Sequence, residues 1–280
     1  MNNKALFDAV SIETSKLTTK AYSTSFSIGI RCLDKELRNP IHAVYGFVRF
    51  ADEIVDTFHN YNKYDLFCRF KNDTMTAIEE RISLNPILNS FQAAVHRYNI
   101  DVELVDQFLE SMEMDLTRSS YDQEGFDKYV LGSAEVVGLM CLHVFCNGNR
   151  ARFAELKPYA MRLGAAFQKI NFLRDLNADY NGLGRTYFPG VDINKFDEQA
   201  KLKIEKSIRE DFSLGYEGIK RLPRSSKLGV YVAYVYYLAL FKKIQNTPSG
   251  YVLKERIRIR NRQKLSILCY SYVKHQLNLI

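Results

Sequence analysis

Apolar residues recur every three to four positions along most of this chain, the spacing that places them on one face of an α-helix. No repeat of fixed period and no linker-like stretch divides the sequence. We therefore predict an all-α protein of about ten helices, with no sheet, in one domain that spans residues 1–280. The segments with helical spacing are 40–58, 63–82, 86–98, 101–118, 124–147, 151–180, 194–221 and 225–245.

Proline marks where some of these helices should begin or bend. The dipeptides Asn39-Pro40 and Asn85-Pro86 each pair a favourable N-cap residue with proline at the first helical position. Pro158 lies inside a long helical segment, where it predicts a kink or a break into two helices.

The composition fits a globular helical protein. Hydrophobic residues make up 46% of the 280, and 14 Gly and 6 Pro are too few for a turn-rich β protein. The five cysteines form no Cys-x-x-Cys pair and no secretory leader is visible, which favours a reducing cytoplasm. The longest uncharged apolar run, 228–241, is shorter than the roughly 20 residues that span a bilayer. We expect a soluble cytoplasmic protein that is peripheral to a membrane at most.

The net charge of +7 favours anionic partners such as diphosphates, membrane surfaces or nucleic acid, or serves solubility only. Residues 256–262 alternate arginine with other residues, which is the period of a strand, although the helical surroundings argue against one. This basic run lacks interleaved aromatics, so we expect no nucleic acid partner. Arg258, Arg260 and Arg262 are candidates for contact with anionic lipid, with a solvated basic edge as the alternative.

Residues 164–190 carry the first strong chemical signal. Asp175 and Asp179 are four residues apart and share a helix face, with Asn171 one turn earlier and Gln168 on nearly the same side. Acids and amides among apolar neighbours are costly to bury without a partner. Because Mg²⁺ prefers carboxylate oxygen, a divalent cation is the expected partner.

A second predicted helix repeats this pattern. Asp52 and Asp56 have the same spacing, and Tyr45 and Arg49 continue their stripe on a helix that is otherwise largely apolar. The stripe therefore faces either a ligand or solvent. In the second case Arg49 would form a surface pair with Asp52 or Glu53.

Two acidic helices that face each other across a cavity could hold Mg²⁺ ions, which would take their remaining ligands from water and a diphosphate. Ionisation of an allylic C–O bond then needs an apolar, water-poor pocket, and the 18 Tyr and 18 Phe can supply its walls. Arg49, Arg185 and Arg256 are suited to hold phosphate oxygens. A di-iron bundle would need Glu-x-x-His pairs, and the chain has none.

Three further features are open to a structural or a chemical interpretation. The small residues of 132–138 allow close helix packing or make room for a ligand chain, and Glu135 is unusual among them. Ser25 and its neighbours could cap a helix or offer hydroxyls to a ligand. Asp115 lies beside Met112 and Met114 and could support a nearby site.

Three motifs follow one another along the chain: Tyr45-x-x-x-Arg49-x-x-Asp52-Glu53-x-x-Asp56, then Gln168-x-x-Asn171-x-x-Arg174-Asp175-x-x-x-Asp179, then Gly184-Arg185-x-Tyr187-Phe188-Pro189. In this order they resemble the squalene/phytoene synthase family, over a stretch from Ser25-Phe26 to about Lys264. The resemblance implies an all-α isoprenoid synthase fold around a central cavity. It also implies a prenyltransferase that uses Mg²⁺, with Mn²⁺ as a substitute, to join two prenyl diphosphates head to head through a cyclopropylcarbinyl diphosphate.

The resemblance assigns roles to residues by motif. The expected Mg²⁺ ligands are Asp52, Asp56, Asn171, Asp175 and Asp179. The expected contacts of the diphosphates and prenyl chains are Ser25, Phe26, Arg49, Gln168, Asn171, Arg185, Tyr187, Tyr236 and Arg256. The residues expected to line the reaction cavity are Tyr45, Tyr129 and Tyr236. The expected catalytic residues are Tyr45, Arg49, Asp52, Asp56, Tyr129, Asp175 and Asp179. The family's Tyr-Cys-x-x-Val-Ala-Gly stretch differs here at Val130, Ser133 and Glu135, which bears on the cavity wall and on chain length.

The Asp-Glu-x-x-Asp form of the first motif is more similar to the phytoene-forming members. That similarity implies that two geranylgeranyl diphosphates give phytoene for carotenoid biosynthesis by proton loss, without NADPH. The alternative is a squalene or dehydrosqualene synthase that acts on farnesyl diphosphate. A non-catalytic helical scaffold of the same fold is the remaining alternative, and such relatives usually lose aspartates that are present here.

Overall fold

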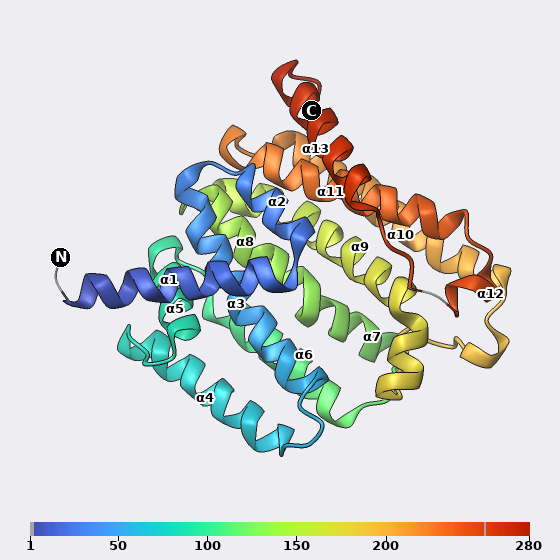
Figure 1. The fold of residues 1–280 in the computed structure, drawn as a ribbon, viewed down its shortest axis with the longest axis horizontal. Helices are drawn as coiled ribbons and strands as arrows, with labels where there is room; N and C mark the ends of the chain where they lie inside the picture. The colour runs from blue at the N-terminus through green and yellow to red at the C-terminus, as the bar shows by residue number, and fades with distance from the viewer. Residues whose placement is uncertain (1–2, 255) are drawn as a thin grey trace.

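The computed structural model describes residues 3–254 and 256–280, which form a bundle of helices without a strand (Figure 1). One isolated parallel bridge, between Ser120 and Thr186, is the only β pairing in this part of the chain. The prediction of an all-α fold without a sheet is confirmed. The helices are α1 (Asn3–Tyr22), α2 (Thr24–Arg31), α3 (Lys35–Asp56), α4 (Lys63–Glu80), α5 (Pro86–Tyr98), α6 (Val102–Thr117), α7 (Gln123–Val130), α8 (Val136–Cys146), α9 (Arg150–Leu183), α10 (Glu198–Arg221), α11 (Arg224–Gln245), α12 (Ser249–Val252) and α13 (Asn261–Gln276). Two short turns, η1 (Leu131–Glu135) and η2 (Ile193–Lys195), complete the list.

Proline marks one helix start and not the other. Helix α5 begins at Pro86, and the side chain of Asn85 caps it by accepting from the backbone N–H of Ile87 at 3.0 Å, as predicted. The predicted start of α3 at Asn39-Pro40 is wrong, because the helix already begins at Lys35. The residues before Asn39 are good helix formers, and a proline near the start of a helix costs few backbone hydrogen bonds.

The structure also tests the predicted kink or break at Pro158 and the strand-like period of residues 256–262. Helix α9 continues past Pro158 to Leu183, so the proline does not divide it. Residues 256–260 form neither strand nor helix, and α13 begins directly after them. Ile257 and Ile259 are buried, while the alternating Arg256, Arg258 and Arg260 are exposed. The alternating pattern therefore reflects an extended strap with every second side chain turned inward.

The predicted helix 124–147 contains a π-helical turn, η1, between α7 and α8. A Cβ added to Gly132 would lie 2.6 Å from the carbonyl oxygen of Gln107 on α6, and one added to Gly164 of α9 would lie 2.7 Å from that of Ala134. Small residues thus let η1 approach both neighbouring helices closely. Ser133, Ala134 and Gly138 also line a cavity. The small residues of this stretch therefore serve close helix packing and also leave open space beside the helices.

Helix α9 runs through the middle of the molecule, where it packs against α8 and α10, while α3 packs against α6 and α8 (Figure 1). This arrangement places both acidic motifs on inner helices. In the described residues one continuous helical stretch, 123–146, is long and apolar enough to cross a membrane, and 56% of its most apolar window is buried inside the protein. A core helix has the same properties, so this is weak evidence for a membrane span.

Candidate active site

The two acidic motifs lie on α3 and α9 and share one electrostatic environment. Burial, then the charges of Asp175 and Asp56, raises the pKa of Asp179 to about 7. Burial and the neighbouring Asp56 carboxylate raise the pKa of Asp52 to about 7 as well. Because Asp56 on α3 influences Asp179 on α9, carboxylates of both helices repel one another, and a bound cation would relieve that repulsion.

Arginines already contact the motif carboxylates. Arg49 binds both Asp52 and Glu53, so the pair predicted as the alternative to a ligand-facing stripe does form. Arg256 of the strap reaches across to α9, where its Nε lies 2.7 Å from Oδ1 of Asp175. Within the described part of the chain, Nε of Arg49 is buried without a hydrogen-bond partner. That donor is available to a phosphate oxygen.

Asp115 of α6 is the centre of a buried polar cluster. Its carboxylate accepts hydrogen bonds from the phenols of Tyr129 (2.6 Å), Tyr121 (3.3 Å) and Tyr187 (3.5 Å). Nη1 of Arg185 lies 3.6 Å from Oδ1 of the same group. Burial raises the pKa of Asp115 to about 6, and the Arg185 charge opposes the rise. The sequence indicated a supporting role for Asp115 but gave no sign of Tyr121, which only the folded chain brings here.

Arg185, in the loop after α9, ties the cluster to the first motif. Its side chain is 5% exposed, and its Nη1 donates to Oδ1 of Asp56 at 2.7 Å. Its Nη2 donates to the carbonyl oxygens of Asp115 (2.8 Å) and Val55 (3.3 Å). One guanidinium therefore fixes the ends of α3 and α6 against the end of α9.

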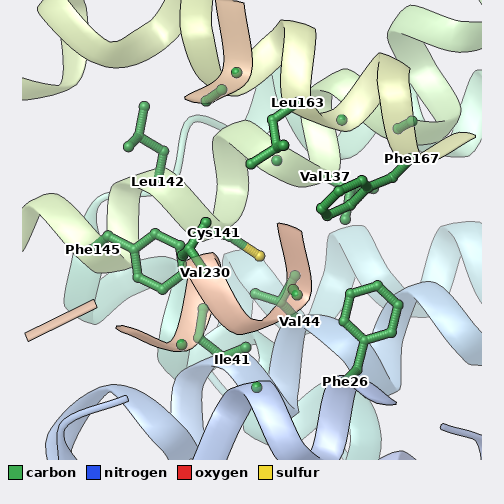
Figure 2. Close-up of a pocket in the computed structure, with 18 of the residues that line it drawn as sticks. Phe26, Ile41, Val44, Val137, Cys141, Leu142, Phe145, Leu163, Phe167 and Val230 are labelled. Atoms are coloured by element: carbon green, nitrogen blue, oxygen red, sulfur yellow. The ribbon is translucent and has the colours of Figure 1, made fainter. Parts of the chain in front are cut away.

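An apolar cavity of about 320 Å³ lies between α2, α3, α8, α9, α10 and α11. Figure 2 shows Phe26 and Phe167 toward one end of it and Leu142 and Phe145 toward the other. Gln168 and Asn171 also line the cavity, and Asn171 is one helical turn, about 6 Å, from Asp175 on the same helix. The end that holds Phe167 is therefore the one next to the acidic motifs.

The predicted tyrosines divide between different places. Tyr45 lines the cavity, and burial raises the pKa of its phenol to about 12. Tyr129 and Tyr236 are not among the residues that line this cavity, and their roles in the reaction stay predictions. Tyr129 points to Asp115 instead, and Tyr236 lies edge-on to Tyr237 with Lys264 over its ring.

Tyr237 is the cavity residue that sequence reasoning missed. Its phenol donates to Oδ1 of Asn171 at 3.3 Å, and its ring stacks on Phe167 with centroids 4.0 Å apart. The sequence contained a signal, because the predicted helix 225–245 is rich in tyrosine. Helical spacing alone did not tell which of two adjacent tyrosines turns inward.

The N-terminal substrate segment is only partly brought to the cavity. Phe26 lines it, with ring centroids 5.9 Å from Tyr45 and 6.2 Å from Tyr237. Ser23 caps α2 by accepting from the backbone N–H of Phe26 at 3.2 Å, the capping role foreseen for this segment. Ser25 is half-buried, and its role as a substrate contact stays a prediction.

Glu135, the main departure from the family pattern, does not line the cavity. Burial raises its pKa to about 7, and the charges of Arg162 and Lys169 oppose the rise while that of Asp211 adds to it. Asp211 is itself buried and paired with both cations. Glu135 therefore turns toward the α9–α10 contact and away from the apolar cavity.

The carboxylates of the two motifs could hold Mg²⁺ through one or two protein ligands per ion, with the remaining ligands supplied by water and substrate phosphates. No three His, Cys, Asp or Glu side chains in residues 3–254 and 256–280 converge as a ready metal site. Mg²⁺ usually takes one or two carboxylates and completes its shell with water and substrate phosphates. Facing pairs of aspartates, two of them with raised pKa values, supply such carboxylates.

Comparisons with known proteins agree with the fold and the motifs. A family model described as squalene/phytoene synthase matches residues 19–263. A phytoene synthase of Cereibacter sphaeroides is 26% identical over 281 residues, which cover 91% of this chain and 78% of that protein. A 4,4'-diapophytoene synthase of Staphylococcus haemolyticus is 26% identical over 197 residues, covering 69% and 67%. A dehydrosqualene synthase crystal structure superposes with a TM-score of 0.81 at 19% identity, over 96% of this chain and 98% of that one.

Proposed function

Because the chain belongs to the squalene/phytoene synthase family, we propose that it is a phytoene synthase that joins two geranylgeranyl diphosphates head to head. The family and the named relatives make it a prenyltransferase-type enzyme that acts on prenyl diphosphates. The proposal adds the C20 substrate, the Mg²⁺ ion and the final proton loss, without NADPH.

One observation carries the proposal: the apolar cavity of about 320 Å³ has its polar end beside the two acidic motifs. Asp52, Asp56, Asp175 and Asp179 would hold Mg²⁺, with Asn171 beside them; the ion supplies charge neutralisation to the leaving diphosphate. Arg49, Arg185 and Arg256 would orient the phosphate oxygens.

The chain's own residues account for the protection of a carbocation. Phe26, Phe167 and Tyr237 form an aromatic wall next to the polar end, and aromatic faces stabilise nearby cations. The rest of the cavity wall is apolar, so it excludes water that would trap the cation as an alcohol. The phenol of Tyr45, with its raised pKa, keeps its proton and can donate a hydrogen bond there.

A C15 substrate is the second candidate, and a specific observation favours it. The relative from Staphylococcus haemolyticus is named a 4,4'-diapophytoene synthase and is as similar as the phytoene synthase is. We place the C20 substrate first because of the Asp52-Glu53-x-x-Asp56 form of the first motif.

Product analysis by mass tests the choice. Purified protein is incubated with geranylgeranyl diphosphate and Mg²⁺, and separately with farnesyl diphosphate, each with and without NADPH and with EDTA as the metal-free control. The proposal expects a C40 hydrocarbon that does not require NADPH. A C30 product from farnesyl diphosphate with no C40 product would overturn it.

We also propose that the enzyme is cytoplasmic and contacts anionic membrane lipid. Arg258 and Arg260 of the strap and Arg262 at the start of α13 are exposed, and α13 also exposes Leu265 and Val273. Cationic and apolar side chains side by side suit an anionic, lipid-covered surface. Sedimentation with phosphatidylglycerol vesicles should decrease as salt increases; binding that is indifferent to salt would contradict the contribution of the arginines.

A further inference from the structure

A second pocket, of about 310 Å³, lies behind Arg185 where α3, α6 and α9 end. It is separate in character from the apolar cavity because charged and polar side chains predominate in its wall. The cationic side chains in that wall are those of Lys63, Arg118 and Arg185, and the other charged or titratable ones are His59 and Asp115. No role has been assigned so far to Lys63 or Arg118.

Two of these cations meet at one oxygen. The carbonyl of Val55 accepts from Nζ of Lys63 at 2.8 Å and from Nη2 of Arg185 at 3.3 Å. Like charges held this close repel each other unless an anion lies between them or beside them. The ammonium of Lys63 also lies 3.5 Å from Nδ1 of His59, which adds no negative charge.

The pocket's negative charge is already engaged. The carboxylate of Asp115 accepts from three phenols and pairs with Arg185. Within residues 3–254 and 256–280, neither Lys63 nor Arg118 forms an ion pair with a carboxylate. Lys71, on the same helix as Lys63, differs in this respect, because its Nζ lies 2.9 Å from Oε2 of Glu113. The pocket therefore has an excess of positive charge and unused donors.

We propose that this pocket binds inorganic diphosphate. Arg185 lies between the pocket and the acidic motifs and contacts both. On one side the guanidinium contacts Asp56; on the other it lines the pocket with Lys63 and Arg118. Arginine matches phosphate oxygens in pairs and lysine acts as a point charge, a combination suited to a multiply charged anion. The source of the diphosphate rests on the proposed function, whereas the binding site itself does not.

The wall composition favours the free anion over a prenyl diphosphate. Thr117, Ser119 and Gly182 line the open side of the pocket and are exposed. Only Leu116 and Leu183 contribute large apolar side chains, so a C15 or C20 tail would remain largely in water.

Equilibrium binding of inorganic diphosphate in EDTA tests the site, because without divalent cations the aspartates repel the anion. Titration calorimetry compares the unchanged protein with Lys63→Gln, Arg118→Gln and the double variant. Lys71→Gln is the matched control, since it removes one lysine from the same helix at a site already paired with Glu113. Each test variant should weaken binding about tenfold or more, as expected for one charge-assisted contact, and the control should leave the Kd unchanged.

Other outcomes are informative. An unchanged Kd in the double variant, or an equal loss in Lys71→Gln, would overturn the proposal. Geranylgeranyl thiodiphosphate is titrated in parallel: equal weakening of its binding by Lys63→Gln would mean that the pocket holds the substrate head group instead. Circular dichroism melting shows whether Lys63→Gln is folded. Because Arg118 is exposed, Arg118→Gln should not disturb the fold and tests the pocket independently. Failure to make a C40 product would leave this binding result untouched.

Discussion

Nη1 of Arg185 lies 2.7 Å from Oδ1 of Asp56, and this contact joins the loop after α9 to the end of α3. The same side chain is almost completely buried and reaches the carboxylate of Asp115 at 3.6 Å. A residue that was singled out by the sequence as a phosphate contact is therefore also a structural tie between three helices. Its chemical role and its structural role must be separated by experiment.

Replacement of Arg185 by Gln should destabilise the fold. Removing one partner of a buried pair leaves Asp115 with uncompensated charge, and such losses typically amount to about 3–5 kcal/mol. Chemical denaturation measures the loss, with Lys71→Gln as a control in a half-buried surface pair, which should change stability by about 1 kcal/mol or less. Arg185→Lys keeps the charge but cannot contact Asp56 and Asp115 together, so we expect it to be intermediate. Equal stability of all three variants would show that Arg185 is not a structural tie.

Replacement of Asp175 by Asn should raise the Mg²⁺ concentration needed for half-maximal activity by about tenfold or more, because an amide is a weaker ligand for a hard cation. Glu53→Gln is the control, since Glu53 pairs with Arg49 and is not an expected ligand. The measurement is initial rate against Mg²⁺ concentration at saturating substrate. An unchanged Mg²⁺ requirement in Asp175→Asn would remove Asp175 from the metal site.

Glu135 should make the protein less stable as pH rises. Burial raises its pKa from the usual 4.5 to about 7 in the folded state. Folding therefore favours the protonated form; this contribution is fully present below about pH 4.5 and is lost as pH rises through 7. The melting temperatures of the unchanged protein and Glu135→Gln should agree at low pH, and the variant should melt higher at pH 8. A constant difference across this range would contradict the raised pKa.

The sequence predicted the pieces of the site that depend on local spacing. Asp175 and Asp179 share a face because of the helical repeat, and Asn85-Pro86 starts a helix because both residues suit its first turn. The contact of Tyr129 with Asp115 was not predicted, because a phenol suits a buried carboxylate as well as a cavity wall and only tertiary packing decides between them. The start of α3 was missed because helix propensity before Asn39 outweighed the usual preference for proline at the first position.

The glycine contact between α2 and α11 sets the position of Phe26. A Cβ on Gly229 would lie 2.4 Å from Cδ2 of Leu33 and 2.7 Å from the carbonyl oxygen of Gly29. Gly229→Ala should destabilise the protein by about 1–3 kcal/mol through overpacking, and Gly250→Ala, with nothing within 4 Å, is the matched control. Chemical denaturation provides the comparison. Identical unfolding free energies for the two variants would mean that α2 can move away from α11 without cost.

The inner part of the apolar cavity should determine which prenyl chain fits. Cys141 lines the cavity, as Figure 2 shows, and a phenyl ring in its place would fill part of the 320 Å³. A shortened cavity penalises the C20 chain more than the C15 chain, because contacts of a few methylene groups change specificity by about ten- to two-hundredfold. Cys141→Phe should therefore lower kcat/KM for geranylgeranyl diphosphate relative to farnesyl diphosphate by at least about tenfold. Cys269→Phe on the exposed face of α13 is the control and should leave the ratio unchanged. If Cys141→Phe also leaves that ratio unchanged while remaining folded, the prenyl chain does not extend past Cys141.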